Sequence, residues 1–220
     1  PQAEIRAANL SYTGTTTSFD LIIRGANVGR CNLPMLGTHN VQNALAAFAI
    51  ADELGIETDT ANSGFESFDG VQRRFTLRGT VNDVSVIDDY GHHPSEVRAT
   101  IDAARASWPD RRVVMVYQPH RYSRTSELFD QFVEVLKSVD VLLLTEVYPA
   151  GEMPIPGSTG FDLFERLRLE MGERAHWAES VAVARDHIAS IIENNDILLT
   201  QGAGETATLA AELQARYHFK

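Results

Sequence analysis

Two polar blocks in the chain combine carboxylate, imidazole and guanidinium groups, and each follows a short apolar run. The first is Asp88-Asp89-Tyr90-Gly91-His92-His93-Pro94, after the run 84–87, and the second is Gln118-Pro119-His120-Arg121-Tyr122-Ser123-Arg124-Thr125, after the run 113–117. Such runs are typical of buried parallel strands, whose carboxyl ends meet at one edge of a sheet. We therefore expect the two blocks to lie close together and to bind phosphate or carboxylate groups.

The first block has a structural and a functional interpretation. Aspartate and glycine are common in turns, and the histidines could be solvated. Alternatively, a carboxylate would bind a ribose hydroxyl and an imidazole a phosphate, as at nucleotide sites on strand ends. Zinc is disfavoured, because adjacent histidines rarely point at one ion.

The arginines of the second block, Arg121 and Arg124, are three residues apart and share a face if a helix begins here. Two guanidinium groups can hold a carboxylate or phosphate by paired hydrogen bonds. Surface ion pairs with Glu127 and Asp130 are the alternative. The neighbouring block of histidines favours the ligand-binding interpretation.

Two further motifs give weaker signals. His39-Asn40-Val41-Gln42-Asn43 opens an alanine-rich helix, where an asparagine could cap the helix or bind a purine edge. Gly202-Ala203-Gly204 lacks the third glycine of a dinucleotide fingerprint, and we interpret it as a tight turn at the rim of the site. The sequence contains no Gly-x-x-x-x-Gly-Lys-Ser/Thr phosphate-binding motif.

The formal net charge of -11 disfavours generic binding to nucleic acid or to an anionic membrane surface. The single Cys31 excludes an intramolecular disulfide, and no apolar stretch approaches the roughly 20 residues that cross a bilayer. We expect a cytoplasmic protein that binds neither nucleic acid nor membrane.

The hydrophobic pattern changes near residue 79, so two domains are expected, 1–78 and 79–220. The first has strand-like runs followed by helices and lacks enough strands for a whole domain: strands 4–10, 18–24 and 28–33, helices 41–51 and 61–68, then loop and strand over 68–75. The second alternates strands and helices: strands 84–87, 113–117, 139–145, 175–177 and 197–200, helices 95–107, 126–137, 161–172 and 181–193, and a last helix ending at 213. Ser95 is the expected cap of the helix 95–107. Alternation with apolar strands predicts an α/β fold, a Rossmann-like open, mainly parallel sheet with helices on both faces, preceded by a partial α/β domain.

Six motifs, in this order along the chain, resemble the Mur ligase family. They are Gly37-Thr38-His39-Asn40-Val41-Gln42-Asn43-Ala44, Gly70-Val71-Gln72-Arg73-Arg74-Phe75, the two polar blocks, Val147-Tyr148-Pro149-Ala150-Gly151-Glu152 and Gln201-Gly202-Ala203-Gly204. The resemblance implies that residues 1–78 are the C-terminal portion of a central ATP-binding domain. It implies that residues 79–220 are the C-terminal ligase domain that binds the amino acid.

The resemblance also implies roles for individual residues. Nucleotide binding would fall to His39, Asn40, Asn43, Arg74, Asp89 and His92. The amino-acid substrate would be bound by Tyr90, His120, Arg121 and Arg124. Three of these side chains would be catalytic: His92, Arg121 and Arg124. Glu205-Thr206-Ala207 departs from the family pattern, so the resemblance assigns no ligand contact there.

Within the family, the motifs imply an ATP-dependent ligase that joins L-alanine to UDP-N-acetylmuramate through an acyl phosphate, for peptidoglycan synthesis. ATP and Mg²⁺ are the implied cofactors, with the metal ligands mainly upstream of this chain and no metal site within it. We expect the chain alone to be inactive. The alternatives are a stand-alone Rossmann-like module that binds a nucleotide or partner, and the related ligase that recycles a murein tripeptide.

Overall fold

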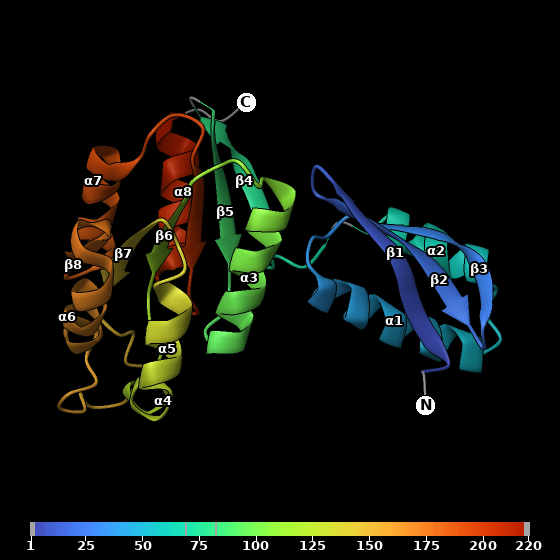
Figure 1. The fold of residues 1–220 in the computed structure, drawn as a ribbon, viewed down its shortest axis with the longest axis horizontal. Helices are drawn as coiled ribbons and strands as arrows, with labels where there is room; N and C mark the ends of the chain where they lie inside the picture. Colours follow the sequence, from blue (N-terminus) through green and yellow to red (C-terminus); the bar gives the residue numbers. More distant parts are fainter. Residues whose placement is uncertain (1–2, 69, 82, 218–220) are drawn as a thin grey trace. The chain divides into compact units, whose positions relative to one another are not determined.

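The computed structural model describes residues 3–68, 70–81 and 83–217 (Figure 1). The chain divides into two compact units, Pro1–Val71 with Ala106–Pro109, and Gln72–Arg105 with Asp110–Lys220. The functional boundary expected between residues 78 and 79 stays a prediction.

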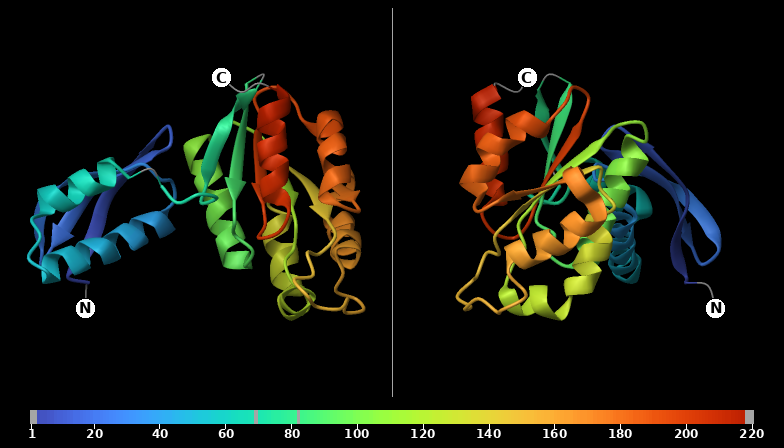
Figure 2. Two further views of the ribbon diagram at one scale, coloured as in Figure 1. Left: turned by 180° about the vertical axis from the view of Figure 1, so that it is seen from behind. Right: turned by 60° about the vertical axis from the view of Figure 1, so that its left-hand side comes forward.

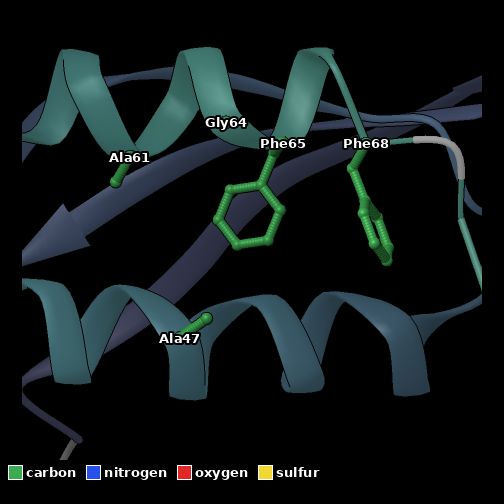
Figure 3. Close-up of a pocket in the computed structure, with 5 residues that line it drawn as sticks. All are labelled: Ala47, Ala61, Gly64, Phe65 and Phe68. Carbon is green, nitrogen blue, oxygen red and sulfur yellow. The ribbon is translucent and has the colours of Figure 1, made fainter.

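The first unit is a three-stranded antiparallel sheet with two helices on one face (Figures 1 and 3). Its elements are β1 (Ile5–Thr13), β2 (Thr16–Ile23), β3 (Ala26–Leu33), α1 (Thr38–Glu53) and α2 (Thr58–Glu66). Phe19 and Leu21 of β2 are fully buried against Phe48 of α1, so the unit has an apolar core of its own. A cavity of 280 Å³ between α1 and α2 has an apolar lining: Ala47, Ala61, Gly64, Phe65 and Phe68 (Figure 3).

The second unit is built on a six-stranded sheet with the strand order β4-β5-β9-β6-β7-β8. Its strands are β4 (Thr76–Val81), β5 (Val84–Asp89), β6 (Val113–Tyr117), β7 (Val141–Thr145), β8 (Ala175–Ala178) and β9 (Ile197–Gln201). Only the β4–β5 pair among these strands is antiparallel. The predicted open, mainly parallel sheet is therefore confirmed.

Helices cover both faces of this sheet, as predicted (Figures 1 and 2). They are α3 (Pro94–Ser107), α4 (Tyr122–Glu127), α5 (Phe129–Leu136), α6 (Gly160–Met171), α7 (Val181–Ile191) and α8 (Thr206–Tyr217), with a 3₁₀ turn, η1 (Gly172–Arg174), before β8. One apolar cluster joins α7 and α8 to the strands on their face, through Ile188, Leu209 and Leu143. Burying apolar side chains on both faces explains why the strands are continuously hydrophobic.

Two predicted elements differ from the structure. The strand expected within residues 68–75 begins instead at Thr76, because Arg73 and Phe75 have φ angles of 58° and 51° and form a turn. The helix predicted over 126–137 is two helices, because Leu128 leaves helical geometry with φ −116° and ψ 20°.

The strands that precede the two polar blocks, β5 and β6, are not neighbours in the sheet. β9 lies between β5 and β6, and Gln201 at its end is level with Asp89 on one side and with Tyr117 on the other. Three strands therefore end at the same edge. The last strand enters the middle of the sheet by long-range pairing, which local sequence patterns do not reveal.

Gly202 allows the chain to leave β9 between two other loops. Its amide donates to the Asp89 carbonyl at 3.1 Å, while the Gln118 amide donates to the Gln201 carbonyl at 3.1 Å. At φ 147°, a Cβ on Gly202 would lie 2.6 Å from the Gln118 carbonyl oxygen. Glycine is required here on both conformational and steric grounds.

We predict that Gly202→Ala lowers the free energy of unfolding of the second unit by about 2–4 kcal/mol, because it combines backbone strain with a clash against main chain. Denaturant unfolding followed by circular dichroism measures this. Gly64→Ala is the control, since Gly64 is helical and a Cβ there meets nothing within 4 Å. Unchanged stability of Gly202→Ala would contradict the assigned geometry.

Candidate active site

Three loops meet at the carboxyl edge of the second unit's sheet. We call them the His loop (residues 90–93, after β5), the Arg loop (residues 118–121, before α4) and the Glu loop (residues 146–152, after β7). The Arg and Glu loops are joined by main-chain bonds: the Tyr148 amide donates to the Pro119 carbonyl at 2.8 Å, and the Arg121 amide to the Tyr148 carbonyl at 2.9 Å. The convergence is therefore fixed by backbone as well as by side chains.

A row of rings runs across the three loops. Ring centroids are 5.3 Å apart for Tyr90 and His92, and 5.5 Å apart for His92 and His120. His120 in turn stacks on Tyr148 at 5.5 Å, with an interplanar angle of 11°. The expectation that the two polar blocks lie close together is confirmed.

Arg73 and Arg74 add positive charge at the Tyr90 end of the row. Their guanidinium carbons lie 5.1 and 5.8 Å from the centroid of the Tyr90 ring, within cation–π range. Arg73 also donates to the Gly202 carbonyl at 2.6 Å, and its Nε lies 3.3 Å from the fully buried Asp88 carboxylate. The sequence did not single out Arg73; its position in the Gly70–Phe75 motif was the available signal.

Asp89 lies beneath the His loop and is almost fully buried. One carboxylate oxygen accepts from the Gly91 amide at 2.7 Å and from Gln201 Nε2 at 2.8 Å, and the other accepts from the Phe75 amide at 2.8 Å. Burial raises the pKa of this carboxyl, against the effect of the Gly91 and Phe75 hydrogen bonds. Asp89 thus holds the base of the loop, and its role toward a ribose stays a prediction.

Glu96 anchors the other end of the His loop. Its Oε2 accepts from the amides of His92 and His93, each at 3.0 Å, while the Ser95 amide lies 3.3 Å from His93 Nδ1. The predicted cap, Ser95, is therefore inside α3, and His93 stands at the cap with Glu96 in a reciprocal position. Burial alone would raise the pKa of Glu96, but these two hydrogen bonds lower it overall.

Arg121 and Arg124 do not share a helical face, because Arg121 precedes α4 with a φ of 72°. The ion pair found for Arg121 within the described residues is with Glu152, at 3.9 Å, and not with the acidic residues suggested by the sequence. Arg124 Nη1 donates to the His120 carbonyl at 3.0 Å and lies 3.3 Å from His120 Nδ1. Both arginines remain at the same edge.

The pKa of His120 is lowered, first by burial and then by the charges of His92, Arg124 and Arg121. A neutral imidazole follows at neutral pH, and its Nδ1 can accept from Arg124. Both contacts of Arg124 use Nη1, one end of a guanidinium with five N–H donors. The other N–H donors of the Arg124 guanidinium are suited to a carboxylate.

His39, Asn40 and Asn43 belong to the first unit, in the first turns of α1. Asn40 is buried and its amide donates to the Leu36 carbonyl at 2.7 Å. Asn43 Nδ2 lies 3.5 Å from Asn40 Oδ1. Their predicted place near an adenine stays a prediction.

The cationic and imidazole groups at the edge fit a nucleotide's phosphates or a carboxylate. Across residues 3–68, 70–81 and 83–217, no group of three or more His, Cys, Asp or Glu side chains could hold a metal ion. None of the helices in the described part of the chain has the length and apolarity needed to cross a membrane.

A doubly wound domain with cationic and imidazole side chains at the carboxyl edge of its sheet is typical of α/β proteins that bind nucleotides or other substrates. Comparison with known protein families identifies one family within this class of α/β proteins. Residues 73–204 match the Mur ligase, glutamate ligase domain, and residues 1–51 match the Mur ligase middle domain. The chain belongs to the Mur ligase family.

Curated relatives include the UDP-N-acetylmuramate--L-alanine ligases of Geotalea daltonii and Sorangium cellulosum. The first is 44% identical over 96% of this chain and 46% of its own length, and the second is 41% identical over 100% and 47%. The chain thus spans about half the length of the curated relatives it matches.

Solved structures of other proteins are also similar to this chain. The UDP-N-acetylmuramate-alanine ligase of Thermotoga maritima superposes with a TM-score of 0.82 at 26% identity, over 99% of this chain and 46% of that one. A folylpolyglutamate synthase from Mycobacterium tuberculosis, at 17% identity and a TM-score of 0.73 over 97% of this chain and 48% of that one, shares the fold.

We predict that Glu96→Ala lowers the free energy of unfolding by about 1 kcal/mol near neutral pH, through the lost cap of α3. The folded-state pKa of Glu96 lies below its ordinary value of 4.5, so its contribution is present above that pH and is lost as the pH falls through the folded-state pKa. Denaturant unfolding at a series of pH values measures the difference from wild type.

Glu165→Ala, on the exposed side of α6, is the matched control and should change stability little at any pH. A Glu96→Ala deficit that stayed constant down to strongly acidic pH would contradict the assigned role of the ionised carboxylate.

Proposed function

We propose that the chain supplies the amino-acid-binding domain, and part of the ATP-binding domain, of a cytoplasmic ligase that joins L-alanine to UDP-N-acetylmuramate at the expense of ATP. The observation that carries this proposal is the meeting of the His and Arg loops, with His92 and His120 rings 5.5 Å apart. The names of the curated relatives support the choice of substrates.

In the proposed reaction, an oxygen of the lactyl carboxylate attacks the γ-phosphorus of ATP, giving an acyl phosphate and ADP. The alanine amine then attacks the acyl carbon, and the tetrahedral intermediate expels phosphate as the carbon–oxygen bond breaks. The protein's part is to position reactants and stabilise negative charge. Mg²⁺ would supply further charge stabilisation on the phosphates, from ligands mainly outside this chain.

The site residues divide these tasks. Arg121 and Arg124 hold the carboxylate of alanine, with Tyr90 and His120 forming the walls around it. Holding that group places the amine within reach of the acyl carbon. His92 faces the transferred phosphate. The residues proposed to bind the nucleotide are His39, Asn40, Asn43, Arg74 and Asp89.

We predict that the 220-residue chain alone neither releases phosphate from ATP nor ligates alanine, because its sequence lacks a phosphate-binding motif of the P-loop type. A phosphate-release assay with ATP, Mg²⁺, alanine and the UDP-sugar tests this. A full-length ligase that carries this sequence is the positive control. Alanine-dependent phosphate release by the chain alone would refute the prediction.

We predict that Arg124→Ala, in a full-length ligase that carries this sequence, raises the KM for L-alanine about tenfold to a hundredfold, as expected for loss of a charge-assisted hydrogen bond. The KM for ATP should change much less. Steady-state kinetics with each substrate varied measures both values.

Arg166→Ala, an exposed arginine on α6 paired with Glu170, removes the same charge away from the site and is the control. Equal losses in the use of alanine and ATP by Arg124→Ala would count against its assigned role.

A further inference from the structure

Glu152 ties the Glu loop to the start of α4. Its Oε2 accepts from the Ser123 amide at 2.9 Å, and its Oε1 accepts from the Ser123 hydroxyl at 2.7 Å. The same Oε1 lies 3.9 Å from Arg121 Nη1. One carboxylate therefore satisfies a free amide at the helix N-terminus and faces a guanidinium of the candidate site.

A tight turn presents this carboxylate. The Glu152 amide donates to the Pro149 carbonyl at 3.0 Å, and the two central residues, Ala150 and Gly151, have φ angles of 49° and 88°. Positive φ at both central positions is the geometry of a type I′ turn, which is costly for alanine. This unfavourable conformation occurs immediately before Glu152, whose side chain faces the candidate site.

Arg121 is under similar strain, with a φ of 72° in a residue that has a Cβ. Such a conformation persists where the surroundings fix it on several sides. Here the fixing bonds come from the Glu loop: the Tyr148 carbonyl accepts from the Arg121 amide, and Glu152 holds Ser123 two residues further on. Loss of the Glu152 bonds would let the Arg loop relax toward ordinary φ values.

We propose that Glu152 is a positioning residue for the amino-acid site: its carboxylate fixes the conformation of the Arg loop and aims the Arg121 guanidinium at the substrate carboxylate. The proposal rests on the proposed function, since the substrate is the amino acid of that reaction. Neither the family match nor the names of the relatives assign a role to this glutamate.

The charge state of Glu152 fits this role. Hydrogen bonds from the Ser123 amide and hydroxyl lower the pKa of the carboxyl, and the charge of Arg121 lowers it further. The group is therefore ionised at neutral pH and acts as an acceptor only. At 3.9 Å, the Glu152 carboxylate orients the Arg121 guanidinium without forming a short hydrogen bond to it. The guanidinium therefore keeps N–H donors for a ligand.

Kinetics of a full-length ligase that carries this sequence test the proposal. Glu152→Ala should raise the KM for L-alanine about tenfold, with the KM for ATP changed by less than about twofold, because only the Arg loop is released. Glu152→Gln retains an acceptor for Ser123 but not the charge that faces Arg121, so its KM for L-alanine should lie between those of wild type and Glu152→Ala. Glu165→Ala is the control for removal of an exposed glutamate.

A double-mutant cycle separates positioning from general stabilisation. If Glu152 acts through Arg121, then adding Glu152→Ala to Arg121→Ala should change the KM for L-alanine by less than about twofold. Fully additive effects, or equal increases in the KM values for alanine and ATP, would overturn the proposal.

A measurement without turnover tests the contact itself. In ¹H–¹⁵N spectra of the 220-residue chain, the Ser123 amide should titrate with the Glu152 carboxyl in wild type and lose that titration in Glu152→Gln. An amide that does not respond would overturn the proposal. Absence of alanine-dependent phosphate release by the wild-type full-length enzyme would instead refute the proposed function, and the Ser123 titration would still decide the Glu152 contact.

Discussion

Three parallel strands, β5, β9 and β6, end in register at one edge of the sheet, and the candidate site depends on this constraint. Gln201, at the end of β9, is in register with both Asp89 and Tyr117, and its side-chain amide donates to the Asp89 carboxylate at 2.8 Å. Gly91 and Gly202 lack the Cβ atoms that would collide with Gln201 and with the Gln118 carbonyl. The His and Arg loops can therefore approach each other across an intervening strand, and the tilted ring contact between His92 and His120 follows from that approach.

Carboxylates arrange the positive charge of the site in a chain whose net charge is -11. Asp88 is fully buried between Arg73 and Arg78, at 3.3 and 2.8 Å, while Glu152 faces Arg121. Removing one partner of a buried pair leaves an uncompensated charge, so Arg73 and Arg78 are held in place by Asp88. The positive charge at this edge is thus fixed by local groups within a chain of negative overall charge.

Sequence patterns located most of the second unit because its strands are apolar and its helices begin at Pro94, Gly160 and Val181, next to turn residues. They failed where the tertiary environment overrides local preference. β4 follows a turn with positive φ at Arg73 and Phe75, which non-glycine residues rarely adopt. The contacts of Glu152 and Arg73 were missed for a related reason, because both join segments that are far apart in the chain.

The sequence by itself determined the class of fold, the family and the residue types at the strand ends, because apolar periodicity and short motifs are local properties of the chain. Only the tertiary structure decided that β9 separates the two strands that carry the polar blocks, that Arg121 stands before α4 and not on it, and that Asp89 is engaged by three protein donors. The physical reason is that strand order and the pairing of buried polar groups depend on long-range contacts, whose partners are fixed when the sheet is assembled.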